Sequence, residues 1–188
     1  MRVLLAEDEP IIRMDVRRLL EELGCQVVGE CRDGNTAVKL TMKLCPDVVL
    51  MDIKMPGTDG LAATRLIHKK LLAPVVLLTS YSDAETVLEA TESGALCYLV
   101  KPVEKEKLGP ALKVARQRFL EIKKLHSEVG KLSVAVADRE VITRAKTTLQ
   151  EKLHCKEQDA FNQMRKRSMD QHRKISAVAR EIVEKEDK

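Results

Sequence analysis

A short apolar run that ends on a carboxylate is the feature that most constrains the fold of this chain. Residues 48–51 read Val-Val-Leu-Met, and Asp52 follows them directly. Such a run is typical of a strand that is buried on both faces. Pro56, Gly57 and Gly60 come next and predict a turn that leads the chain away from the strand. We therefore expect Asp52 at the carboxyl end of a strand, where open α/β sheets place their reacting groups.

Similar apolar runs recur along the first 100 residues, and segments with helical periodicity separate them. The runs predict further strands at residues 3–6, 25–29, 74–79 and 96–100. The predicted helices cover residues 10–23, 36–44 and 61–72, and a fourth begins at a Ser82–Glu85 capping box and ends at Gly94. Strands that alternate with helices of about ten to fifteen residues predict an α/β fold with a parallel, doubly wound sheet.

Composition and length indicate a soluble protein with one domain and an appendage. The chain has 188 residues, of which 44% are hydrophobic and 33% are charged. The N-terminus becomes acidic at Glu7, too early for a signal peptide, and no apolar run is long enough to span a membrane. The five cysteines are scattered and form no CxxC pair, which favours free thiols. We expect a cytoplasmic protein that does not contact a membrane.

The residues that end the predicted strands form a chemically coherent set. Glu7 and Asp8 follow the first strand and Asp52 ends the third, while Thr79 and Lys101 end the fourth and fifth. These ends lie along one edge of a parallel sheet, so the side chains should converge. Three converging carboxylates require a cation, and oxygen ligands suit Mg²⁺. Asp52 could then act as a nucleophile toward phosphorus, with Lys101 and Thr79 binding the new phosphoryl oxygens.

This set resembles the receiver domain of two-component response regulators over residues 1 to about 118. The resemblance rests on Glu7-Asp8, on Asp52 with Met55-Pro56 and Asp59-Gly60 behind it, on Thr79 and on Lys101-Pro102. It implies a flavodoxin-like five-stranded sheet of order 2-1-3-4-5. It also implies that Glu7, Asp8, Asp52 and the Lys54 backbone carbonyl hold Mg²⁺, and that a sensor histidine kinase phosphorylates Asp52.

The same resemblance implies two further features near the fifth strand. The Lys101-Pro102 bond should be cis, as it is in the family. Tyr98 matches the family's switch aromatic, which turns inward when Thr79 moves toward the phosphoryl group. The alternative is that Tyr98 is only a surface aromatic on a short strand.

Beyond residue 104 the sequence predicts helices only. There is no proline after Pro110, so a long continuous helix is possible. Within it, apolar residues recur at alternating spacings of three and four, namely Ile122, Leu125, Val129, Leu132 and Val136. This heptad pattern predicts a coiled-coil linker over residues 119–138, weakened at Gly130 by about 1 kcal/mol relative to alanine. Packing of the stripe on C-terminal helices of the same chain is the alternative.

Positive charge is concentrated in the C-terminal third. Residues 1–120 hold 17 basic and 17 acidic residues, whereas residues 139–180 hold 11 basic and 5 acidic ones. This local excess favours a polyanionic partner, although a solvated helical face is the common explanation for a charge run.

The C-terminal segment reads as three helical pieces, with breaks near residues 154–155 and 170–171. Residues 139–180 resemble the ANTAR domain, an RNA-binding antiterminator module that follows receivers, and we expect the domain to cover residues 139–188. The resemblance rests on Ala145-Lys146, Ala160, Met164-Arg165, Ser168-Met169 and Val178-Ala179. The chain departs from the family pattern at Thr147, where glycine is usual, at Lys156, where a capping serine or threonine is usual, and at Met164, where leucine is usual. Lysine cannot accept hydrogen bonds from a helix start, so the second helix should begin less firmly.

RNA binding would depend on phosphate contacts, because the chain has no tryptophan and only two phenylalanines and two tyrosines for stacking. The candidate residues are basic or small, and they comprise Lys146, Arg165, Lys166, Arg167, Arg173 and Lys174, with Ala145 and Ala160 allowing close approach. The alternative is that these basic residues only solvate the surface.

Together these features predict a phosphorylation-controlled response regulator. By resemblance, it binds stem-loops in nascent leader RNA as a homodimer that pairs through the coiled coil when phosphorylated, and prevents transcription termination. Within the family it looks most like the ethanolamine-utilisation regulators. A DNA-binding helical output and a protein-interaction output are the alternatives. An enzymatic output is disfavoured because no Cys/His/acid grouping after residue 120 has catalytic spacing.

Overall fold

The computed structural model describes residues 1–80 and 84–185, and the chain divides into two compact units. The first comprises Met1–Lys124 and the second Leu125–Lys188. Each unit is described by itself. The predicted boundaries at residues 118 and 138 stay predictions.

The first unit is built on a five-stranded parallel sheet, which confirms the predicted fold class. Its strands are β1 (Arg2–Ala6), β2 (Gln26–Cys31), β3 (Val48–Asp52), β4 (Val75–Thr79) and β5 (Cys97–Val100). The spatial order is β2-β1-β3-β4-β5, as expected for a flavodoxin-like sheet. The connecting helices are α1 (Pro10–Glu22), α2 (Gly34–Leu44), α3 (Gly60–Lys69) and α4 (Ala84–Glu92), and α5 (Lys105–Leu153) begins in this unit.

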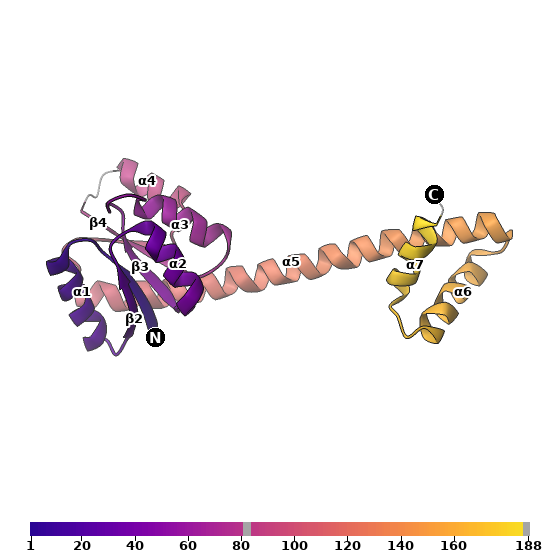
Figure 1. The fold of residues 1–188 in the computed structure, drawn as a ribbon, viewed down its shortest axis with the longest axis horizontal. Coiled ribbons are helices and arrows are strands. Elements are labelled where there is room, and N and C mark those ends of the chain that lie inside the picture. The colour runs from indigo at the N-terminus through magenta and orange to yellow at the C-terminus, as the bar shows by residue number, and fades with distance from the viewer. Residues whose placement is uncertain (81–83, 186–188) are drawn as a thin grey trace. The chain divides into compact units, whose positions relative to one another are not determined.

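Helices cover both faces of the sheet (Figure 1). One face packs against α1 and α5 through residues such as Leu20 and Leu112, and the other packs against α2 and α3 through residues such as Ala37 and Ile67. All five residues of β3 are buried, which explains its continuous apolar sequence. Because side chains alternate between the faces, the two cores fix the register of each strand.

Two helix ends differ from those predicted from the apolar periodicity, because local backbone and capping contacts determine them. The Asp33 side chain accepts a hydrogen bond from Thr36 N at 2.8 Å, so α2 begins at Gly34 rather than Thr36. Helix α3 ends at Lys69 instead of residue 72, because Leu71 has a left-handed backbone (φ 48°). The predicted Ser82–Glu85 capping box lies outside the described residues and side chains.

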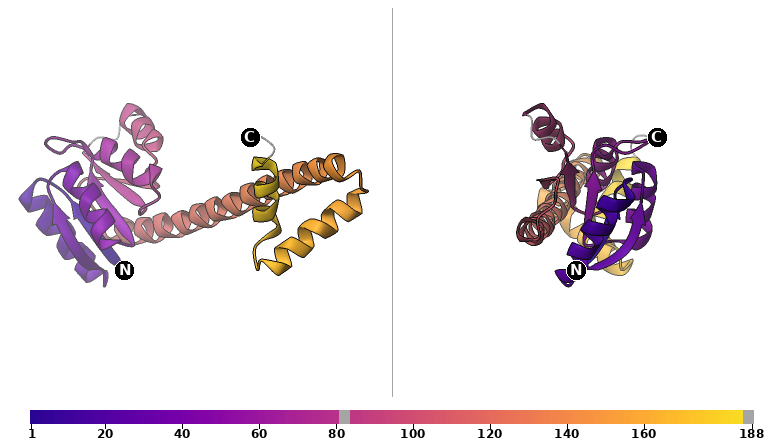
Figure 2. Two further views of the ribbon diagram at one scale, coloured as in Figure 1. Left: turned by 45° about the vertical axis from the view of Figure 1, so that its right-hand side comes forward. Right: turned by 90° about the vertical axis from the view of Figure 1, so that its left-hand side faces the viewer.

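The second unit contains the last part of α5, with α6 (Glu157–Asp170) and α7 (Ile175–Glu184). Figure 2 shows how these helices pack against one another. Their small core comprises Ala145, Leu149, Ala160, Met164, Val178, Ala179 and Ile182. The predicted breaks are confirmed, since α5 ends at Leu153 and α6 ends at Asp170. Lys156 precedes α6 without a side-chain cap, as its chemistry predicts.

The predicted coiled-coil stripe lies on the exposed surface of α5. Leu125, Val129, Leu132 and Val136 are 58% to 66% exposed, so the helices α6 and α7 do not cover them. The alternative of packing on the C-terminal helices of the same chain is therefore wrong for these four residues. None of the described helices combines the length and apolar character needed to cross a membrane.

Candidate functional sites

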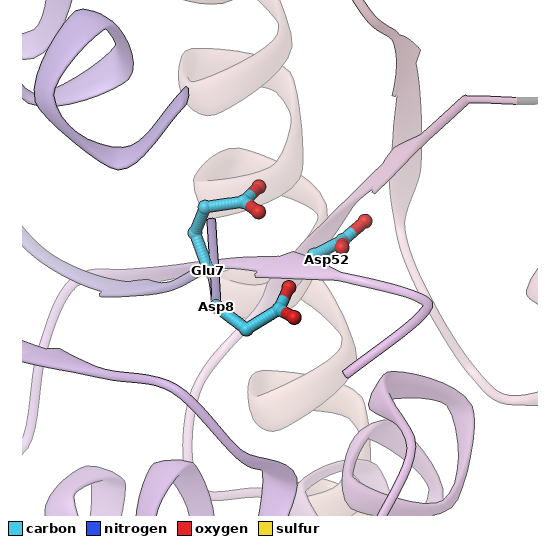
Figure 3. A group of neighbouring side chains, drawn as sticks. All are labelled: Glu7, Asp8 and Asp52. Carbon is cyan, nitrogen blue, oxygen red and sulfur yellow. The ribbon is translucent and has the colours of Figure 1, made fainter. Parts of the chain in front are cut away.

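Three carboxylates meet at the carboxyl edge of the sheet. Glu7 and Asp8 follow β1 and Asp52 ends β3, and these strands are neighbours that pair Ala6 with Met51. One carboxylate oxygen from each residue lies within 4.8 Å of the other two (Figure 3). Glu7 is fully buried and Asp52 is only 5% exposed. The sequence prediction that these acids converge is realised in the geometry.

Lys101 joins this cluster from the end of β5. Its Nζ atom is 2.7 Å from Glu7 Oε2 and 3.1 Å from Asp52 Oδ1. The buried Glu7 Oε2 thus has the Lys101 ammonium as its ion-pair partner and no other donor among the described residues. The backbone N–H of Lys101 donates to the Thr79 carbonyl at 2.8 Å, and the Lys101-Pro102 bond is cis as predicted.

The electrostatics of the cluster favour a further cation. Burial raises the pKa of the Glu7 and Asp52 carboxyl groups, and the Lys101 ammonium offsets part of this rise. Burial alone would lower the pKa of Lys101, but the two carboxylates raise it overall, so the lysine stays charged. Three carboxylates against one ammonium leave two uncompensated negative charges when all are ionised.

The donor set fits Mg²⁺. It offers only carboxylate oxygens within reach of one another, and its charge excess over the single Lys101 ammonium matches a divalent ion. A shallow groove of about 530 Å³ adjoins the cluster, with Asp8, Lys54, Asp59 and Glu89 among its lining residues. Lys54, whose backbone carbonyl was predicted as a ligand, lines the same groove as Asp8, and its role as a ligand stays a prediction.

Gly60 allows the turn after β3 to close tightly against Asp52. Its N–H donates to the Ile53 carbonyl at 2.8 Å. A Cβ atom at this position would lie 2.9 Å from the carbonyl carbon of Asp52 and closer still to its oxygen. The Asp59 side chain caps α3 by accepting from Ala62 N at 2.6 Å. The Asp59-Gly60 pair therefore stabilises the turn and the helix start that follow Asp52.

The two predicted switch residues lie on adjacent strands. Thr79 ends β4 and is 3% exposed, and β5 places Tyr98 two residues before Val100, the residue that pairs with Thr79. Tyr98 is 41% exposed, so its ring lies at the surface here. Whether Tyr98 turns inward stays a prediction.

The basic candidates of the second unit differ in how they are paired. Lys146 forms an ion pair with Glu157, and Arg173 lies 3.0 Å from Glu181. The other four candidates are exposed and have no ion pair among the described residues, namely Arg165, Lys166, Arg167 and Lys174. These four candidate side chains can meet an incoming phosphate without first leaving a carboxylate.

Two RNA-binding assignments are corrected by the structure. Ala145 and Ala160 are 0% exposed in the core between α5, α6 and α7, so they cannot contact RNA in this conformation. Their small side chains allow the helices to approach one another. At these two positions, the residues of the ANTAR motif pack the helices together.

Two residues that contact the candidates were not predicted from the sequence. Arg13 donates to the backbone carbonyls of Glu7 and Asp8, and Glu157 pairs with Lys146. Each contact joins residues on either side of a turn. Helical or strand periodicity does not predict contacts of this kind. Arg13 is only 11% exposed despite its charge, a burial that the sequence pattern does not reveal.

Comparison with known proteins assigns both units. Residues 3–113 match the response regulator receiver domain and residues 130–183 match the ANTAR domain. The transcriptional regulatory protein PdtaR of Mycobacterium tuberculosis is 43% identical over 183 residues, which cover 97% of this chain and 89% of PdtaR. Protein-glutamate methylesterases, such as that of Archaeoglobus fulgidus, match only 54% of this chain and 30% of their own length.

Solved receiver domains share the fold of the first unit. The receiver domain of NarL from Mycobacterium tuberculosis aligns with a TM-score of 0.59 and 31% identity, covering 62% of this chain and 95% of that domain. The receiver domain of a sensor histidine kinase from Pseudomonas aeruginosa aligns with a TM-score of 0.57 and 28% identity. The alignment covers 62% of this chain and 97% of that domain. That structure has a magnesium ion coordinated in its active-site cleft.

Proposed function

Since the chain belongs to the response regulators that combine a receiver domain with an ANTAR domain, we propose that phosphorylation of Asp52 controls its binding to RNA. A sensor histidine kinase supplies the phosphoryl group. The output helices bind stem-loops in nascent leader transcripts and prevent termination, which places the protein in the cytoplasm. The convergence of Glu7, Asp8, Asp52 and Lys101 at one edge of the sheet carries this proposal.

Asp52 is the proposed phosphoacceptor. One of its carboxylate oxygens forms a bond to phosphorus while the bond from phosphorus to the kinase histidine nitrogen breaks, which leaves an acyl phosphate on Asp52. Mg²⁺, held by Glu7, Asp8, Asp52 and the Lys54 backbone carbonyl, would supply positive charge that shields the incoming phosphoryl oxygens from the carboxylates.

The other residues at this edge respond to the new charge. Lys101 already lies 3.1 Å from Asp52 Oδ1, and its raised pKa keeps it protonated, so it can pair with a phosphoryl oxygen. The Thr79 hydroxyl donates a hydrogen bond to a second phosphoryl oxygen. The movement of Thr79 then allows Tyr98, on the adjacent strand, to turn inward and alter the surface near β5 and α5.

The exposed stripe of α5 is the proposed dimer contact. Its spacing places β-branched Ile122, Val129 and Val136 at one heptad position and Leu125 and Leu132 at the other. That arrangement favours a parallel two-stranded coiled coil. The dimer would let two RNA modules act on one transcript, which raises the apparent affinity without new contacts. The narrower likeness to ethanolamine-utilisation regulators stays a prediction.

RNA contacts are assigned to exposed cations of the second unit. Arg165, Lys166, Arg167 and Lys174 lie on α6 and at the start of α7 without acidic partners among the described residues. Lys146 and Arg173 are also candidates, but each must first leave a carboxylate. Phosphate contacts position the RNA, while the shape of the loop and an arginine that reads an exposed base supply specificity.

The test compares the wild-type chain with Asp52→Ala, each with and without its kinase and ATP. Binding to a hairpin RNA is measured at one fixed salt concentration, with duplex DNA as competitor, because the affinity of basic domains depends on salt. Phosphorylation should strengthen RNA binding by the wild type and leave Asp52→Ala unchanged. Equal kinase-dependent binding by the two proteins would refute control through Asp52, and preference for the duplex would refute the RNA target.

A further inference from the structure

Arg13 connects helix α1 to the backbone of two residues in the acidic cluster. Its Nη1 atom donates to the Glu7 carbonyl at 2.8 Å and to the Asp8 carbonyl at 3.3 Å. Its Nε atom lies 3.3 Å from Glu30 Oε2 on β2. With 11% of its side chain exposed, this guanidinium is nearly buried. Arg13 thus contacts both residues that follow β1 and a neighbouring strand at once.

Glu30 is itself held in place by a second arginine. Arg17 Nη1 lies 2.7 Å from Glu30 Oε1, and Arg17 Nε lies 2.9 Å from Glu21 Oε1. Glu30 therefore receives one guanidinium on each carboxylate oxygen, which fixes the direction from which it contacts Arg13. The backbone next to this network is also held, because Glu7 N donates to the Cys31 carbonyl at 3.0 Å.

Burying a guanidinium among backbone carbonyls costs solvation, so its position calls for a reason. The two carbonyls that it binds belong to the residues whose carboxylates crowd against Asp52. Those like charges repel one another, and the β1–α1 junction that carries Glu7 and Asp8 would relax if its backbone were free. The Arg13 contacts oppose that relaxation.

We propose that Arg13 is a positioning residue for the divalent-cation site. It fixes the backbone of Glu7 and Asp8 so that their carboxylates stay directed at the ion, and Glu30 fixes the guanidinium. This inference rests on the proposed function in one respect, namely that the acidic cluster binds Mg²⁺. Metal ligands elsewhere depend on such supporting contacts, whose loss lowers metal affinity about 10- to 100-fold.

The sign of the effect separates positioning from simple charge. Arg13 is a cation close to a cation site, so removing its charge alone would tighten Mg²⁺ binding through weaker repulsion. Loss of positioning would weaken Mg²⁺ binding, because the Glu7 and Asp8 carboxylates would no longer be held in place. The two explanations therefore predict opposite changes in the dissociation constant for Mg²⁺.

The experiment titrates Mg²⁺ into the full chain by calorimetry, without phosphodonor. Variant Arg13→Met removes the donors, and Arg18→Met is the matched control, since Arg18 lies on the same helix, is 65% exposed and pairs only with Glu22 among the described residues. The dissociation constant should rise about tenfold in Arg13→Met and stay near the wild-type value in Arg18→Met. Thermal unfolding of each variant confirms that it is folded.

Glu30→Gln is the second variant and carries the test if Arg13→Met does not fold. It leaves Arg13 on the carbonyls but removes the charge that orients the guanidinium. Because the loss of an anion by itself also weakens Mg²⁺ binding, Glu21→Gln is its control, since Glu21 carries the same charge but pairs with Arg17. Glu30→Gln should bind Mg²⁺ more weakly than Glu21→Gln does. An unchanged or lower dissociation constant in folded Arg13→Met overturns the role of Arg13, and so does equal binding by Glu30→Gln and Glu21→Gln if Arg13→Met is unfolded. A wild-type chain that takes up no Mg²⁺ overturns the cation site itself, which is a different failure.

Discussion

Substitution of two glycines by alanine should have opposite effects on stability. Gly60 begins α3 beside Asp52, where ordinary van der Waals contact starts at 3.4 Å but an added Cβ would lie 2.9 Å from the Asp52 carbonyl carbon and closer to its oxygen. Overpacking of this kind costs about 1–3 kcal/mol. Because the backbone at residue 60 must shift to relieve this contact, the 2.8 Å hydrogen bond from its N–H to the Ile53 carbonyl is also lost, which adds about 1 kcal/mol.

Gly130 provides the matched control. It lies inside α5, and an added Cβ would meet nothing within 4 Å. Gly130→Ala should therefore stabilise the helix by about 1 kcal/mol, because alanine loses less backbone entropy than glycine. The same one-carbon change is thus expected to destabilise the first unit by about 2–4 kcal/mol at residue 60 and to stabilise the second at residue 130.

Differential scanning calorimetry is the suitable assay, because the two units can unfold in separate transitions. Gly60→Ala should lower the melting temperature of the receiver transition and weaken Mg²⁺ binding, since the strain falls on the backbone of Asp52. Gly130→Ala should leave Mg²⁺ binding unchanged. Wild-type receiver stability in Gly60→Ala would show that the turn can shift freely, and the reasoning about Asp52 would then be wrong.

Three further predictions concern pH, pairing and RNA. Burial raises the pKa of Asp52 above its ordinary 3.8, so its contribution to stability is complete below pH 3.8 and is lost as the pH rises through the native pKa. In thermal melts without metal, the receiver of Asp52→Asn should therefore lose less stability between about pH 4 and 7 than the wild-type receiver does. A pH profile equal to that of the wild type would contradict this. Val129→Lys should abolish dimers of the phosphorylated chain in sedimentation, whereas Val134→Lys, equally exposed but outside the heptad stripe, should not. Because Lys146 is paired with Glu157, Lys146→Ala should reduce hairpin affinity less than Arg165→Ala, and the reverse ranking in a filter-binding titration would contradict the pairing argument.

Local sequence patterns were sufficient for the strand ends that carry the site, but not for β2, which ends at Cys31 instead of the predicted residue 29. The apolar run before Asp52 and the turn residues after it place this carboxylate correctly, because β-strand burial and turn chemistry are properties of adjacent residues. The uncapped start of α6 was also predictable, since Lys156 has no acceptor for the first amides of the helix.

Contacts between distant elements were not predictable in the same way. Ala145 and Ala160 belong to a recognisable motif, but only the packed helices show that both are buried, which excludes direct RNA contact. The hydrogen bonds from Arg13 to the carbonyls of Glu7 and Asp8 depend on how α1 is oriented after β1, and residue spacing in the sequence does not predict them. The supporting contacts of a site therefore emerge from tertiary structure even when its reactive groups are visible in the sequence.

The hydrogen bond from the Lys101 amide to the Thr79 carbonyl has a mechanical consequence. It tethers the main chains of the two residues proposed to grip the phosphoryl group, so displacement of one strand end pulls on the other. In the proposed mechanism, a movement of Thr79 would therefore reach Lys101 and the loop leading into α5 through the backbone as well, alongside the inward turn of Tyr98.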